Sequence, residues 1–247
     1  MRNLVSAELL KLRTTRAFWA YVASIVVFVP ISIALSITVG NDQNPLASSD
    51  GVRGVFSASS SGLLMAVLLG ITMSAGEFRN NTATPTFLIT PDRRRVMAAK
   101  ALAGSILGVV LAAISAVLTV AIATPWLQAR DVGVDLLGAD VIVPIAGALL
   151  SLALGVIFGI GIGALISNQT IAITVIVVWS SIIEALLTGF VPEFGRWLPN
   201  GAATALGGTW TSEGGLLPFW AAALVLAGYC ASTAAAGTHL ITREDLT

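Results

Sequence analysis

Apolar residues along this chain gather into six long runs, separated by short polar segments. Each run holds roughly the 20 residues that an α-helix needs to cross about 30 Å of hydrocarbon. The strict alternation of apolar and polar residues that indicates membrane β-strands is absent from the sequence. The pattern predicts an all-α polytopic membrane protein with one transmembrane domain over residues 1–247. Its spans are expected at about 18–39, 55–75, 97–123, 141–166, 170–189 and 216–241.

Composition supports a bilayer environment. The chain has 247 residues, of which 56% are hydrophobic and 11% are charged, and its 13 basic and 13 acidic side chains cancel. Soluble domains carry about 25% charged residues. So few charges cannot cover the surface of a water-soluble protein. A nucleic-acid-binding protein and an ordinary cytosolic enzyme are therefore excluded.

The basic residues predict the orientation of the chain, because Lys and Arg collect on the cytoplasmic side of a membrane. If the amino terminus is inside, only Arg53, Arg130 and Arg196 of the 13 basic residues fall outside. Both termini of this multi-pass protein are then expected in the cytoplasm.

Several kinds of chemistry are missing from the sequence. Neither of the two lysines, Lys11 and Lys100, follows a glycine, so the chain has no phosphate-binding loop for ATP. One histidine, His239, and one cysteine, Cys230, do not supply a zinc motif. We therefore expect no catalytic residue, cofactor or metal on this chain, and interpret it as a protein that moves, holds or signals something.

The densest polar segment is the loop at 76–96, between the second and third spans. Within it, Phe87, Leu88 and Ile89 are consecutive large apolar residues between charged flanks. A plain connector would not expose them to water, so they are expected to dip into the membrane or to dock into a partner. The alternative is a solvated loop whose arginines only set the topology.

This loop resembles the cytoplasmic loop of type-2 ATP-binding-cassette (ABC) transporter permeases, in particular the small actinobacterial ones. The resemblance rests on the order Glu77, Thr82/Thr84, Leu88, Thr90-Pro91, Arg94 and Lys100 before an apolar helix. The amino-terminal segment 7–16 and the run from Pro192 to Trp197-Leu198-Pro199 are similar to the same family.

The resemblance implies a six-helix half-transporter in a bacterial cytoplasmic membrane. It would pair with a second permease copy, identical or different, and with two copies of an ABC ATPase subunit that hold ATP and Mg²⁺. A short coupling helix in the loop would sit in a cleft of the ATPase. The implied coupling residues are Glu77, Thr84, Phe87, Leu88, Pro91 and Arg94, with Phe87 and Leu88 as buried anchors.

Residues 2–16 predict an interfacial helix that lies on membrane lipid. Val5, Leu9 and Leu12 are expected on its apolar face, with Glu8 and Lys11 pointing elsewhere. A frayed tail that only sets the topology is the alternative.

Glu184 lies well inside the fifth predicted span, where a charge costs about 2.5–3.5 kcal/mol to insert. It is expected either near the interface, hydrated or protonated, or facing a cavity where it contacts a cationic substrate or a neighbouring hydroxyl. Beyond it, residues 190–215 form either an interfacial loop or, as the family implies, short re-entrant outer helices with breaks at Pro192 and Pro199.

Small residues repeat every four positions in the fourth span, which predicts close helix contacts within one subunit or at a dimer seam. They are Gly147, Ser151, Gly155, Gly159 and Gly163.

The sequence thus predicts the permease subunit of an ABC exporter for an amphipathic or hydrophobic compound such as a drug, an antibiotic or a lipid-like molecule. Two alternatives remain open. One is a proton-coupled secondary transporter that uses Glu184, although no internal repeat is evident. The other is a membrane immunity or signalling protein that binds a ligand without transport.

Overall fold

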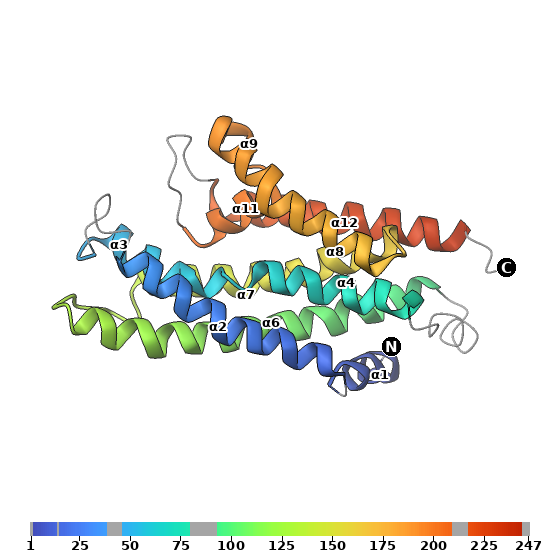
Figure 1. Ribbon diagram of the computed structural model, residues 1–247, viewed down its shortest axis with the longest axis horizontal. Coiled ribbons are helices and arrows are strands. Elements are labelled where there is room, and N and C mark those ends of the chain that lie inside the picture. Colours follow the sequence, from blue (N-terminus) through green and yellow to red (C-terminus); the bar gives the residue numbers. More distant parts are fainter. Residues whose placement is uncertain (1, 14, 39–45, 80–92, 209–216, 244–247) are drawn as a thin grey trace.

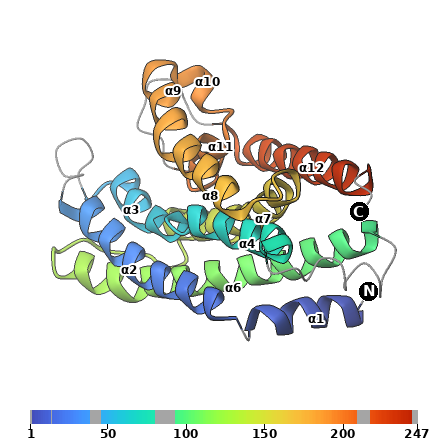
Figure 2. The same cartoon turned by 45° about the vertical axis from the view of Figure 1, so that its right-hand side comes forward.

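A computed structural model of the chain describes residues 2–13, 15–38, 46–79, 93–208 and 217–243. Every regular element in these ranges is helical, and Figures 1 and 2 show the long helices packed side by side. The elements are α1 (Arg2–Arg13), α2 (Arg16–Thr38), α3 (Ser49–Phe56), the 3-10 turn η2 (Ser57–Ser60), α4 (Leu63–Arg79), α6 (Arg93–Gln128), α7 (Ala139–Leu165), α8 (Gln169–Val178), the π-helical turn η3 (Trp179–Ile183), α9 (Glu184–Phe190), α10 (Pro192–Gly195), α11 (Pro199–Leu206) and α12 (Phe219–Arg243).

Six helical segments are long and apolar enough to cross a membrane. They lie close to the six predicted spans, so the expectation of an all-α polytopic membrane protein is confirmed. The segments are Arg16–Thr38, Ser49–Glu77, Arg95–Gln128, Ala139–Leu165, Gln169–Phe190 and Phe219–Leu240.

Two spans differ from the prediction by five residues or more at one end. The second begins at Ser49 instead of 55 and is assembled from α3, η2 and α4. The third does not stop at 123 but runs through Pro125 to Gln128. A proline removes a single backbone donor, and the carbonyl of Pro125 still accepts the N–H of Ala129 at 3.0 Å, so the last turn closes.

Helix α7 is the centre of the bundle and packs against α4, α6, α11 and α12. Glycines of α7 and α4 set the closest approach: a Cβ on Gly159 of α7 would lie 2.0 Å from the carbonyl oxygen of Val67 in α4, and one on Gly70 of α4 would lie 2.1 Å from that of Val156 in α7. Only glycine permits this separation. The small-residue stripe therefore makes helix contacts within one chain, as the first of the two sequence interpretations expected.

The first and last described helices end at the same end of the bundle. Figure 1 shows α1 and the end of α12 toward the right-hand end of the bundle, where α4 ends and α6 begins. An even number of spans requires this arrangement. That this end faces the cytoplasm stays a prediction from the distribution of basic residues.

The segment after α9 folds back onto the bundle. Helix α10 packs on α9, and α11 packs on both α12 and α7, so the chain returns to the core before α12 begins. Figure 2 shows α9 and α10 at the top and α11 beneath them. Pro192 and Pro199 stand in the first turns of α10 and α11, where a missing N–H costs nothing.

Candidate functional site

A buried lysine joins three helices where α4 ends and α6 begins. The side chain of Lys100 is only 2% exposed, and its ammonium lies 3.1 Å from Oε2 of Glu8 and 3.0 Å from Oε1 of Glu77. It also donates a hydrogen bond of 2.9 Å to the carbonyl of Met73 in α4. The charge of Lys100 is thus satisfied by one carboxylate from α1, one from α4 and a backbone oxygen.

A second lysine closes the cluster. The ammonium of Lys11 lies 2.9 Å from Oε1 of Glu8 and 2.9 Å from Oε1 of Glu77. Each carboxylate therefore faces both cations, and the charges of the four groups cancel. We call these residues, Glu8, Lys11, Glu77 and Lys100, the loop-base network, because Glu77 precedes the loop at 80–92 and Lys100 follows it.

Neighbouring charges stabilise the charged forms of Glu8 and Lys11 in α1. Burial raises the pKa of Glu8, but the positive charges of Lys100 and Lys11 and their hydrogen bonds outweigh it, so the net pKa lies below the ordinary value. Burial lowers the pKa of Lys11, and the hydrogen bonds and negative charges of Glu8 and Glu77 outweigh it, so the net pKa lies above the ordinary value.

The predicted orientation of α1 is wrong at Glu8. This side chain does not point away from the apolar face; it is buried within the bundle, whereas Leu10 is 63% exposed. Glu8 lies three residues after Val5 and next to Leu9, both of which pack on the core, so helical spacing already places it on their face. Its stabilising partner Lys100 is 92 residues away, and no local pattern indicates that pairing.

Most of the coupling residues implied by the family resemblance lie outside the described ranges. Glu77 is in α4 and belongs to the loop-base network. Thr84, Phe87, Leu88 and Pro91 fall within 80–92, and Arg94 is described only as backbone of the first turn of α6. The coupling helix therefore stays a prediction, while both flanks of the loop have a defined place.

Glu184 caps a short helix. Its side chain is 1% exposed, and Oε1 accepts the backbone N–H groups of Asn200 and Gly201 in the first turn of α11. These N–H groups lack partners within the helix, and the helix dipole adds a favourable positive potential. We call this contact the Glu184 cap. It joins α9 to α11, and the recorded partners of the carboxylate are backbone groups.

The π-helical turn η3 aligns the Glu184 cap. Such a turn widens the helix and leaves a backbone carbonyl without its usual partner. The side-chain amide of Asn200 donates to the carbonyl of Ser180 in η3 at 3.3 Å.

Glu184 and Ser180 also line a cavity of about 130 Å³ together with Trp179. The carboxylate thus faces a cavity, as one of the two sequence interpretations expected, and its burial disagrees with a hydrated position near the interface.

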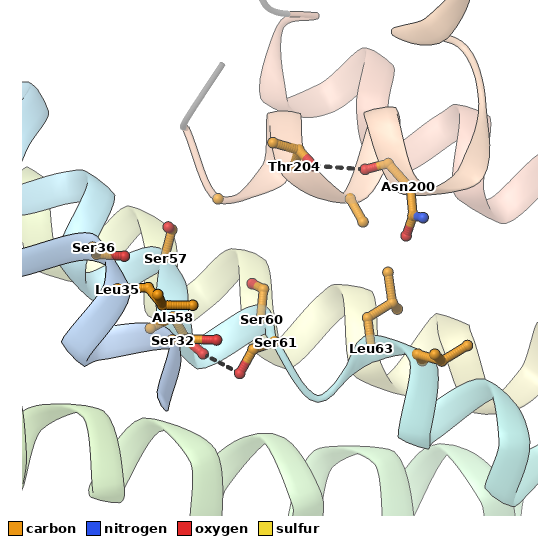
Figure 3. Close-up of a pocket in the computed structure, with 13 residues that line it drawn as sticks. Ser32, Leu35, Ser36, Ser57, Ala58, Ser60, Ser61, Leu63, Asn200 and Thr204 are labelled. Carbon is orange, nitrogen blue, oxygen red and sulfur yellow. Dashed lines mark hydrogen bonds between the residues drawn. The ribbon is translucent and has the colours of Figure 1, made fainter. Parts of the chain in front are cut away.

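A larger cavity of about 460 Å³ lies between α2, the turn η2 and α11. Figure 3 shows serine side chains from the first two elements facing Asn200 and Thr204 across it. Sequence reasoning missed this site. The signals were the serine-rich run 57–61 and two serines four residues apart in the first span, but only the fold brings α11 opposite them. We call it the serine-lined cavity; its polar lining residues are Ser32, Ser36, Ser57, Ser60, Ser61, Asn200 and Thr204.

The two residues with reactive or metal-binding potential are dispersed. Cys230 is buried in α12 and donates to the carbonyl of Leu154 at 3.1 Å. His239 lies one turn before the end of the same helix, beside a cavity of about 480 Å³. Within the described ranges, no group of three or more His, Cys, Asp or Glu residues is arranged to hold a metal ion.

The geometry therefore offers three features: an ionic junction at the base of a loop, a carboxylate that holds an inserted short helix, and an uncharged polar cavity. Comparison with protein-family models and with curated proteins found no match to this chain.

Proposed function

We propose that this chain is the membrane-spanning permease subunit of an ABC exporter. A separate ATPase subunit binds and hydrolyses ATP, and this chain forms the pathway for an amphipathic or hydrophobic compound. Two ATPase copies and a second permease copy complete the transporter. The chain itself performs no catalysis.

The loop-base network is the observation that carries the proposal. An ATPase that pushes on the loop at 80–92 moves the transported compound only if the loop transmits force to the helices. Glu77 and Lys100 flank that loop, and their ion pair at 3.0 Å joins α4 to α6 directly. Glu8 adds α1 to the same junction. A displacement of the loop would therefore move three helices together.

The apolar triplet supports the same proposal. Phe87, Leu88 and Ile89 belong to the segment 80–92, whose flanks are held by this network. Apolar anchors in a loop with rigid ends suit a protein cleft, because their burial supplies affinity while the charged flanks fix the register.

The test asks whether a P-loop ATPase is encoded next to this chain and co-purifies with it. In nanodiscs, the assembled complex should hydrolyse ATP faster than the ATPase alone. Leu88→Asp should abolish this stimulation, because a carboxylate would be buried without a partner in the ATPase cleft, while membrane insertion stays intact.

Leu137→Asp is the matched control. Leu137 is an 83% exposed leucine in the connection before α7, and it should tolerate the same change. Equal stimulation by the Leu88→Asp variant and the wild type would overturn the proposal, as would the absence of any co-purified ATPase.

A proton-coupled secondary transporter is the second candidate, because Glu184 is buried and lines a cavity. The two candidates differ in their energy source. Proteoliposomes with an imposed pH gradient and no ATP should accumulate substrate only if the second candidate holds, and Glu184→Gln should then stop the accumulation.

A further inference from the structure

The serine-lined cavity presents polar residues in pairs. Ser32 and Ser36 of α2, Ser57 and Ser61 around η2, and Asn200 and Thr204 of α11 are each four residues apart in the sequence. In the α-helices α2 and α11, side chains at this spacing lie about one turn, or 5–6 Å, apart on one face. Ser57 and Ser61 bracket a 3-10 turn, so their side chains diverge, but Figure 3 shows both beside the same space.

The hydroxyls of Ser32 and Ser36 have no hydrogen-bond partner among the described residues, although their helix offers carbonyls. Ser24 and Thr38 of the same α2 donate to the carbonyl four residues earlier, at 2.9 and 2.6 Å. This is the ordinary state of a hydroxyl in a membrane helix. Ser32 and Ser36 face the cavity instead.

Ser60 supplies a second, independent sign. Its hydroxyl is buried and without a partner in the described part of the chain, and it lines the same cavity. A buried hydroxyl without a hydrogen bond costs about 1–3 kcal/mol. Once this hydroxyl rotates toward the cavity, a ligand with hydroxyl groups would remove that cost.

The remaining lining selects against charge. Within the part of the chain that the structure describes, every lining residue is a Ser, Thr, Asn, Gly, Ala or Leu, so none of these is titratable. A charged ligand group would lose its hydration without an ion partner. Ser57 and Ser61 already donate to backbone carbonyls at 2.6 and 2.7 Å, which leaves their oxygens as acceptors. Donors and acceptors are thus mixed, as a ligand hydroxyl requires.

We propose that the serine-lined cavity binds the neutral, polyhydroxylated head of an amphipathic compound, a sugar or polyol group on an apolar chain. The cavity volume of about 460 Å³ accommodates such a head. Leu35 is exposed, lies between Ser32 and Ser36 in α2, and receives the start of the apolar chain. This inference deepens the proposed function by naming its substrate class, and it rests on that function only for the act of transport.

The test compares three ligands that share one chain and differ in the head. Radiolabelled octyl β-glucoside is equilibrated below its micellar concentration with the full chain in nanodiscs, and partition into empty nanodiscs is subtracted. We expect one saturable site per chain. Unlabelled octyl trimethylammonium and octyl sulfate should displace the glucoside at least tenfold more weakly than unlabelled glucoside does.

The double variant S32A/S36A tests the site itself. Loss of two hydroxyls should weaken glucoside binding about tenfold. The matched control is S24A/S232A, which removes two membrane-helix serines that lie outside the cavity and bond within their own helices. Its affinity should equal that of the wild type. Equal affinity for all three heads, or equal binding by S32A/S36A and the wild type, would overturn the inference.

A chemical readout guards against a change in folding. In a Cys230→Ala background, Ser36→Cys should react with a small maleimide, and saturating octyl β-glucoside should slow that reaction at least threefold. An unchanged rate would overturn the inference. Neither assay contains an ATPase, so a negative result here combined with intact ATPase stimulation rejects the substrate class alone. Glucoside binding without ATPase stimulation rejects the pump alone.

Discussion

The loop-base network and the Glu184 cap bury carboxylates in two different ways. In the network, Glu8 and Glu77 are balanced by the full charges of Lys11 and Lys100, which together join α1, α4 and α6. In the cap, the hydrogen-bond partners of the Glu184 carboxylate among the described residues are backbone N–H groups of α11. An ion pair in a low-dielectric site is a strong coupling whose loss leaves an unpaired charge. A helix dipole is a weaker coupling that depends on the position of one short helix.

This difference separates the mechanical roles of the two regions. The network ties three long elements at the base of the loop, so it suits the transmission of force. The cap holds α11, a helix of 8 residues that also borders the serine-lined cavity through Asn200 and Thr204. A weaker contact there lets α11 shift and change the cavity. We therefore expect variants in the network to damage the whole fold and variants in the cap to act locally.

The largest effect is expected for Lys100→Met. Without this ammonium, Glu8 and Glu77 share only Lys11, and one buried negative charge is unpaired. Breaking a buried ion pair costs about 3–5 kcal/mol. Thermal unfolding in detergent micelles should show this loss. The double variant Glu8→Gln with Lys100→Met restores neutrality and should recover much of it; equal stability of the single and double variants would contradict the role of charge balance.

Gly201→Ala should disrupt the Glu184 cap by a steric clash, without any change of charge. A Cβ at this position would lie 2.0 Å from the carbonyl oxygen of Gly195 in α10, so α11 must move away from Glu184. Overpacking of this kind costs about 1–3 kcal/mol. Gly189→Ala is the control, because a Cβ there meets nothing within 4 Å. Similar melting temperatures for the two alanine variants would refute the tight contact.

Glu8→Gln should reveal the network through pH. At neutral pH we expect a loss of about 2 kcal/mol, the scale of hydrogen bonds to charged groups. Because the folded-state pKa of Glu8 is lowered, its stabilisation is present above the unfolded pKa and disappears as pH falls through the folded pKa. The difference between wild type and variant should therefore vanish in acid, in melting curves recorded from about pH 3 to pH 8. A difference that persists in acid would show that charge is not its cause.

The contribution of Lys11 to stability should be lost at high pH instead of low pH. The folded-state pKa of Lys11 is raised, so its contribution is complete below the unfolded pKa and is lost only as pH rises through the folded pKa. The contributions of Glu8 and Lys11 are thus both present across the neutral range, which suits a junction with a permanent structural role.

The smallest effect is expected for Glu184→Gln. The amide oxygen still accepts from Asn200 and Gly201, and only the attraction between charge and helix dipole is lost, about 1 kcal/mol. Glu193→Gln in α10 changes an exposed carboxylate and should leave stability unchanged. If Glu184→Gln lowered the free energy of unfolding as much as Lys100→Met, the Glu184 cap would be as strong as the loop-base network, and the comparison would fail.

The sequence predicted the bilayer environment, the six spans and close helix contacts at the small residues, because apolar run length and four-residue spacing are local properties. It singled out Glu184 because a charge within an apolar run is costly, and Glu77 through the family resemblance. The sequence did not indicate which groups Glu77 and Glu184 contact. Glu77 meets Lys11 across 66 residues, and Glu184 meets the backbone of Asn200, which carries no charge in the sequence.

What the chain determines by itself is where it leaves water, because hydrophobic transfer depends only on the residues in each segment. Tertiary structure decides which polar groups meet once they are inside. Pairing Glu8 with Lys100, and placing α11 opposite the serines of α2 and η2, depend on helix packing around α7, where glycines let the backbones approach. In a low-dielectric interior an unpaired polar group is expensive, so these distant pairings fix how the helices are arranged.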